Sequence, residues 1–253
     1  MSGQSSVNPT ELWDEYLRLE KDFLDFITYV PLKDEHYSVW SPRLADLLLR
    51  IGSNVDSFCK NALFDSTFDQ TTDIIMYRSR ARTADGASKI SMKDYQNIFE
   101  TAYNLSTKRI VSIRERKVIA PYDSWISNNS PKWWSDYNAI KHDRFLHQTR
   151  ATMNSALQGL GALFILYICH LETRKYLIDI DFFNLGGCPK ERARGIVLCQ
   201  PEPIDHEFGY LRMYGKSSLF GYVFEILKRP ITDENRIKIF SSDTPKFDRA
   251  FLD

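Results

Sequence analysis

Apolar residues recur every three or four positions over long stretches of this chain, and that spacing constrains its fold more than any other feature. Two such stretches each begin with a helix-capping signal. Asn8-Pro9-Thr10-Glu11 combines an N-cap, a first-turn proline and a capping-box glutamate, and Ser41-Pro42 repeats the cap and the proline. The stripes that follow are Leu12, Tyr16, Leu19, Phe23, Phe26 and Val30, and then Leu44, Leu48, Ile51, Val55 and Phe58. They predict two helices joined by a loop, and hence an antiparallel pair.

A third apolar stripe predicts one long helix from Asp143 to about Tyr176. Its members are Leu146, Thr149, Met153, Ala156, Leu160, Phe164, Tyr167 and Leu171. Small residues form a second stripe on the same segment, at Ser155, Gly159 and Ala162. Because a glycine inside a helix costs about 1 kcal/mol relative to alanine, this stripe predicts the close approach of another backbone. We favour a helix of the same chain as that partner over a second subunit.

Between these helices the pattern changes. Ser91-Met92-Lys93-Asp94 is a capping box that opens a helix to about Asn104, and residues 62–84 fit a weakly patterned helix. Arg109–Ala120 is rich in Ile and Val with charges between them. Within it, Arg114-Glu115-Arg116 fits the turn of a small β-hairpin or of a bent extended segment.

The last part of the chain has short β-like runs in place of helical patterns. Gly195–Cys199 and Tyr210–Tyr214 are two such runs that could pair as a hairpin, and Ser218–Lys228 fits a final short helix. Residues 230–253 are polar and predict an extended or partly ordered tail.

We therefore predict a mainly α fold, a helical bundle with long antiparallel helices plus one or two small β-hairpin insertions. Residues 8–176 would form the helical bundle domain, with the hairpin near 109–120 inside it. Residues 177–253 would form a C-terminal α+β extension that packs on the bundle.

Composition narrows the class of protein. Hydrophobic residues make up 43% of the chain, but the longest apolar run, Leu160–Cys169, has about half the length of a membrane span. Met1–Asn8 is polar and lacks the apolar segment of a signal peptide. The 4 cysteines form no C-x-x-C pair, and the 5 histidines lack the spacing of metal ligands. We expect a cytoplasmic protein with reduced cysteines, no membrane contact, no metal and no cofactor, because the nucleotide-binding loops are also absent.

Chemistry-bearing side chains gather just before the predicted long helix. Extending its stripe backwards from Leu146 leads through His142 and then Asn138, which predicts that both point into the bundle near one end. Lys141 and Arg144 lie on a neighbouring face. An imidazole, a carboxamide and two cations suit a phosphate ester, and histidine exchanges a proton near neutral pH.

A structural interpretation of the same residues stays open. Asn138 and His142 could instead hydrogen-bond a carboxylate of a neighbouring helix, such as Glu20 or Asp56, and so fix the register of the bundle. Their aromatic neighbours would then be ordinary core residues: Trp133, Trp134 and Tyr137.

The formal charge is zero over the whole chain, but it is unevenly distributed. Between Met76 and Val118 ten basic residues stand against four acidic ones, whereas Glu11–Glu35 holds eight acidic and three basic residues. A basic segment with interspersed aromatic residues suits a nucleic-acid backbone. The predicted nucleic-acid-binding residues are Arg78, Arg80, Arg82, Lys108, Arg109, Arg114 and Arg116. The alternative, weighted equally, is a solvated face that pairs with the acidic first helix.

The segment Tyr137-Asn138-x-x-Lys141-His142-Asp143-Arg144, preceded by Trp134 and followed by an apolar helix, looks like that of a family of uncharacterised bacterial helical proteins. The resemblance covers about residues 10–176. The arrangement is similar to the HEPN superfamily, helical bundles that often act as metal-independent ribonucleases in toxin–antitoxin, CRISPR and antiphage systems. This chain lacks the usual HEPN signature, an arginine followed by four to six residues and a histidine.

The resemblance implies RNA as the ligand, and a homodimer or a defence-complex protein as the partner. In such a ribonuclease His142 would be the general base or acid, Lys141 and Arg144 would stabilise the phosphorane charge, and Asn138 would orient the imidazole. The ribose 2′-OH would be the nucleophile, so no metal would be needed. The alternative is a non-catalytic interaction subunit or regulator in a bacterial defence complex.

Overall fold

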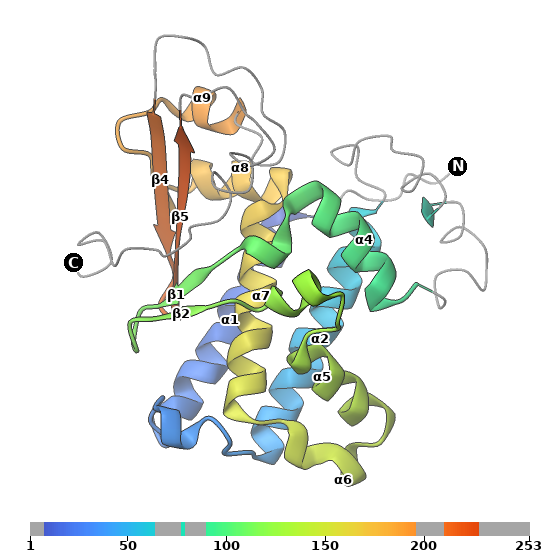
Figure 1. Ribbon diagram of the computed structural model, residues 1–253. Coiled ribbons are helices and arrows are strands. Elements are labelled where there is room, and N and C mark those ends of the chain that lie inside the picture. The colour runs from blue at the N-terminus through green and yellow to red at the C-terminus, as the bar shows by residue number, and fades with distance from the viewer. Residues whose placement is uncertain (1–7, 64–76, 79–89, 196–209, 228–253) are drawn as a thin grey trace.

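Two capped helices run side by side in opposite directions, as their apolar stripes predict (Figure 1). The computed structural model describes residues 8–63, 77–78, 90–195 and 210–227. Helix α1 spans Pro9–Ile27, helix α2 spans Pro42–Ala62, and the short 3-10 helix η1 (Asp34–His36) lies between them. The predicted N-caps are present: the side chains of Asn8 and Ser41 each accept a hydrogen bond from a first-turn N–H group.

The predicted single helix over residues 143–176 is wrong, because the chain breaks into shorter helices there. Helix α5 (Lys132–His142) is followed by α6 (Arg144–His147), the 3-10 helix η5 (Gln148–Arg150), α7 (Met153–Cys169) and α8 (Leu171–Asp179). A polar side chain accepts a backbone N–H at the start of three of these helices: Asp143 from Leu146, Thr152 from Ser155, and His170 from Thr173. Such caps give the backbone N–H groups a partner other than the carbonyl of a continuous helix. The spacing of apolar residues does not predict them.

Helix α7 is the centre of the core and packs against α1, α2 and α5 (Figure 1). Nearly all of its residues are buried. Helices α7 and α8 together have the length and hydropathy of a membrane span, but they are bent by 84° at His170. Among the residues that the structure describes, no single helix is long and apolar enough to cross a membrane.

Small residues allow the close approach of these helices. A Cβ atom at Gly159 would lie 3.1 Å from Ile51 of α2 and 3.4 Å from Trp133 of α5, which confirms a partner within the same chain. The contact at Gly52 of α2 is closer still, because a Cβ atom there would lie 2.3 Å from the ring of Tyr137 of α5. Because the two glycines have no side chain, α5 can pack closely against α2 and α7.

In the described part of the chain, one antiparallel sheet of five strands lies beside the helices, in the order β2-β1-β5-β4-β3 (Figure 1). The strands are β1 (Ile110–Ser112), β2 (Lys117–Ile119), β3 (Phe183–Asn184), β4 (Tyr210–Lys216) and β5 (Phe220–Leu227). The predicted hairpin near 109–120 is confirmed as β1 and β2, and β1 also pairs with β5. The predicted helix over 218–228 is wrong, because this segment pairs along its length with β4. Its Phe, Tyr, Val and Ile residues favour a strand once a partner is available.

The remaining described elements are short. Helix α4 (Met92–Tyr103) begins with the predicted capping box, in which Ser91 and Asp94 each accept a hydrogen bond from the other's backbone N–H. The others are the 3-10 helices η3 (Leu105–Thr107) and η4 (Asp123–Ser127) and helix α9 (Lys190–Gly195). Most of the predicted helix over 62–84, the predicted β run after Gly195 and the tail over 230–253 lie outside the described residues. The described chain is mainly helical with a small antiparallel sheet.

A buried carboxylate ties the sheet to the first helix. Glu20 of α1 is only 2% exposed, and it accepts hydrogen bonds from the Tyr16 hydroxyl at 2.9 Å and the Leu219 N–H at 3.0 Å. It also accepts the hydroxyl of Ser217, in the turn between β4 and β5. Burial, and then the charge of Glu20, raise the pKa of Tyr16 well above its usual value, so that the phenol stays protonated and donates.

We expect the variant Gly52→Ala to lower the free energy of unfolding by about 2 kcal/mol, because the new methyl group would overlap the Tyr137 ring. The sign of this change is informative, because a Gly→Ala substitution inside a helix normally raises the free energy of unfolding. Urea unfolding followed by circular dichroism measures the change, with Ser53→Ala on the exposed face of α2 as the control. A Gly52→Ala protein that is more stable than wild type would contradict the close packing of α5 on α2.

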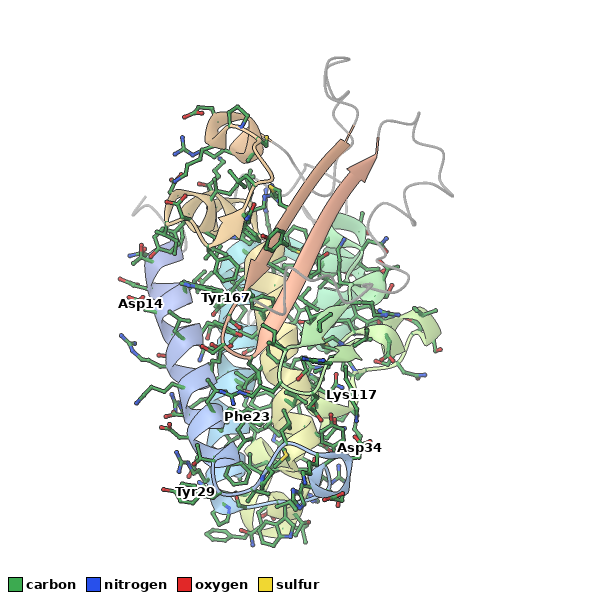
Figure 2. The ribbon with its side chains drawn as sticks, turned by 90° about the vertical axis from the view of Figure 1, so that its left-hand side faces the viewer. Asp14, Phe23, Tyr29, Asp34, Lys117 and Tyr167 are labelled. Carbon is green, nitrogen blue, oxygen red and sulfur yellow. The ribbon has the colours of Figure 1, made fainter. Side chains whose placement is uncertain are left out.

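Replacing Glu20 by alanine should lower the free energy of unfolding by about 3 kcal/mol, because several buried donors lose their acceptor together. Asp14→Ala removes an exposed carboxylate from the same helix and serves as the control (Figure 2). Hydrogen exchange should also show faster exchange at the turn around Ser217 in Glu20→Ala alone. Equal stability of the two variants would contradict the inference that the hydrogen bonds of Glu20 hold the sheet against α1.

Candidate functional site

The four predicted catalytic residues lie where α5 ends and α6 begins, at the end of the bundle away from β4 (Figure 1). Asn138 is half-buried on α5, whereas Lys141 and His142 are exposed in its last turn. Arg144 is the first residue of α6. The four residues therefore lie between positions 138 and 144, across the junction of α5 and α6.

The prediction that His142 points into the bundle is wrong. Helix α5 ends at His142, and Asp143 takes an extended conformation with φ −148° and ψ 94°. Because the helix does not continue, the stripe traced backwards from Leu146 does not follow one face. The His142 side chain is exposed and makes no hydrogen bond with any described residue.

The competing structural interpretation is correct for the aromatic residues and wrong for the carboxylates. Trp133, Trp134 and Tyr137 are buried core residues, with exposures of 2%, 6% and 3%. Asp56, however, accepts hydrogen bonds from Lys60 and from the Tyr95 hydroxyl, and Glu20 is held by the β4–β5 turn. Neither carboxylate contacts Asn138 or His142.

The cations of this turn differ in their partners. The Lys141 ammonium lies 5.4 Å from the centre of the Tyr137 ring and pairs with no carboxylate among the described residues. Arg144 forms an ion pair with Asp46 of α2, with Nη1 2.7 Å from Oδ1. The pair is half-exposed and contributes little to stability, but it holds the guanidinium near the end of α5.

Two large apolar side chains project from α6 into solvent. Phe145 is 89% exposed and Leu146 is 70% exposed. The apolar spacing of the sequence does not indicate this surface, because it places Leu146 in the core stripe. The signal that could have revealed it is Asp143, whose carboxylate caps a new helix at the Leu146 N–H. We call the surface formed by Lys141, His142, Arg144, Phe145, Leu146 and Arg150 the α5–α6 corner.

The predicted basic segment does not form one continuous surface in the described part of the chain. Lys108 is 1% exposed, and this burial removes it from the predicted nucleic-acid surface. Arg109 donates to the backbone carbonyls of Ser106 and Lys108, and Arg78 donates to that of Leu63. The other predicted binding residues are Arg114 and Arg116, which are exposed at the β1–β2 turn, and Arg80 and Arg82, which lie outside the described residues.

Lys117 of the basic segment pairs with the loop that follows α1, whereas the alternative interpretation predicts pairing with the acidic first helix itself. The Lys117 ammonium bonds Asp34 of η1, and Figure 2 shows the two side by side. The Tyr37 hydroxyl donates to both oxygens of Glu115, at 2.8 and 2.7 Å. Burial, followed by the hydrogen bond to Glu115, raises the pKa of Tyr37 above its usual value. These contacts hold the β1–β2 turn against the loop that follows α1.

Comparison of the chain with protein-family models, with curated proteins and with solved structures finds no match in any of the three. Within the described ranges, no three His, Cys, Asp or Glu side chains gather as a metal site would require.

Because Leu146 of α6 is exposed, the stability of variants at this position tests whether the predicted long helix is interrupted here. Leu146→Ser should change the free energy of unfolding by less than about 0.5 kcal/mol, because the leucine is in solvent. Leu160→Ser, at a fully buried position of α7, should cost about 4 kcal/mol or more. Thermal unfolding of both variants measures the difference. A Leu146→Ser protein as unstable as Leu160→Ser would show that residue 146 belongs to the core.

Proposed function

We propose that the protein binds RNA at the α5–α6 corner and cleaves it without a metal ion, as a HEPN-like protein of bacterial defence or stress response. The observation that carries the proposal is the exposed His142 imidazole, which follows the exposed Lys141 in the chain and precedes the exposed Phe145 by three residues. An aromatic ring in solvent can stack on an unpaired base, and the cations can hold the adjacent phosphates.

In the proposed reaction His142 takes the proton of a ribose 2′-OH, whose oxygen attacks the neighbouring phosphorus. The 2′-O–P bond forms, the P–O5′ bond breaks, and the leaving 5′-oxygen receives a proton from an imidazolium. The products are a 2′,3′-cyclic phosphate and a 5′-hydroxyl end. Lys141 and Arg144 stabilise the phosphorane charge, and the half-buried Asn138 positions the site from the preceding turn.

A homodimer joined near the corner would supply a second His142 as the proton donor. Phe145 and Leu146 support such contacts, because exposed apolar side chains ringed by polar ones are typical of interaction sites. The same two residues favour a second candidate function, a non-catalytic subunit or regulator that docks a partner protein in a defence complex. The exposed Arg114 and Arg116 at the β1–β2 turn would be separate backbone contacts for RNA.

The purified protein should degrade single-stranded RNA in the presence of EDTA, and His142→Ala should reduce the rate at least a hundredfold, because the proton-transfer group is lost. His36→Ala is the matched control, since His36 lies in η1 and bonds the Pro31 carbonyl. Folding of each variant is checked by circular dichroism, and cleavage is followed on labelled RNA.

Unchanged cleavage by His142→Ala would remove the assignment of the catalytic residue. An absence of cleavage by wild type, together with Phe145-dependent binding of a protein partner, would favour the regulator instead. If wild type binds RNA without cleaving it, and this binding weakens in Lys141→Ala and Phe145→Ala, the proposed RNA-binding surface stands and the proposed ribonuclease activity is excluded.

A further inference from the structure

A second group of polar side chains without partners lies at the other end of α5 from the α5–α6 corner. A cavity of about 390 Å³ opens there between β2, the segment before α5, and the first turns of α5 and α7. Lys132 in its wall and His142 at the corner are separated by the length of α5, about 15 Å at the rise of an α-helix. The cavity is therefore a separate site.

Four polar side chains in the cavity wall have no hydrogen-bond partner among the described residues. Asn154 and Gln158 lie one turn apart on α7 and present their carboxamides. Ser124 has a buried hydroxyl without a partner, and the carboxylate of Asp123 is beside it in the chain. A buried hydroxyl that bonds nothing is costly, so a ligand that supplies polar atoms to this wall would be stabilised.

The charges of the wall, and of Asp136, which pairs with it, argue against an anionic ligand. Asp136 of α5 is 3% exposed, and its Oδ2 accepts hydrogen bonds from the Lys132 ammonium and the Ser155 hydroxyl, both at 2.6 Å. The ammonium is therefore already paired with a carboxylate. Asp123 adds a negative charge, so a phosphate or carboxylate in the cavity would meet repulsion. A single exposed carboxylate is also a weak site for an amine.

The remaining wall is apolar and includes Pro121, Pro131 and Trp133. A fitting ligand is thus neutral, has one apolar face, and carries several groups that both donate and accept hydrogen bonds. Vicinal hydroxyls on a sugar ring have this chemistry, because each pairs with the oxygen and the NH₂ of a carboxamide or with a carboxylate. We propose that this cavity binds a sugar ring through its hydroxyl groups. The ring could belong to a free monosaccharide or to the ribose of a nucleoside.

Saturation-transfer NMR on the full chain tests the proposal with D-glucose, D-galactose, D-ribose and uridine as probes. Tetrahydropyran serves as a ring without hydroxyls, 2′,3′-dideoxyuridine as a nucleoside without the diol, and ethanolamine as a cation. We expect at least one diol probe to bind, and signal from uridine alone would identify the ribose of a nucleoside as the source. Asn154→Ala and Gln158→Ala should each weaken binding about tenfold, because each removes a hydrogen-bonding group.

The matched control is Asn61→Ala, an exposed asparagine at the end of α2 outside the cavity. It should bind the probe as wild type does. Because the Asn154 and Gln158 side chains bond nothing in the fold, both variants should keep the wild-type melting temperature. The proposal is overturned if no diol probe binds at tens of millimolar, if the cavity variants bind equally well, or if dideoxyuridine, tetrahydropyran or ethanolamine binds as strongly as the diols.

Discussion

The close approach of α2, α5 and α7 is the constraint on which the rest of the structure depends. Gly52 leaves room for the Tyr137 ring, and Gly159 leaves room for Ile51 and Trp133. The aromatic face of α5 is thereby buried, and the polar face of the same helix is turned outward. Because α5 is fixed along its length, its two ends are fixed as well, one at the α5–α6 corner and the other at the cavity.

The zero net charge is a sum over the whole sequence and says little about how charge is placed on the surface or about partners. Asp34 of the acidic segment bonds Lys117 of the basic segment, so the two segments neutralise each other in part. Asp22 of α1 is paired instead with Arg50 of α2, outside the basic segment. At the α5–α6 corner, by contrast, Lys141 pairs with no described carboxylate. We therefore propose the nucleic-acid surface at this corner and not along the basic segment that the charge count indicates.

The sequence predicts those elements whose signals are local. The caps at Asn8 and Ser41, the capping box at Ser91 and the turn at 114–116 all form as expected. The sequence does not predict the secondary structure of segments whose conformation depends on a tertiary partner. The segment 220–227 becomes a strand because β1 and β4 flank it. The cap at Asp143 ends the helical stripe and turns Leu146 to solvent, and His142, which the stripe placed inside the bundle, is exposed.

The central claim is that RNA contacts the α5–α6 corner, and photo-crosslinking locates the contact directly. RNA containing 4-thiouridine is irradiated with the full chain, and the modified peptides are identified by mass spectrometry. The account predicts crosslinks in the peptide that holds Lys141 and Phe145, and their loss in Phe145→Ala. Crosslinks confined to the β1–β2 turn, or none above the level of a scrambled competitor, would contradict it.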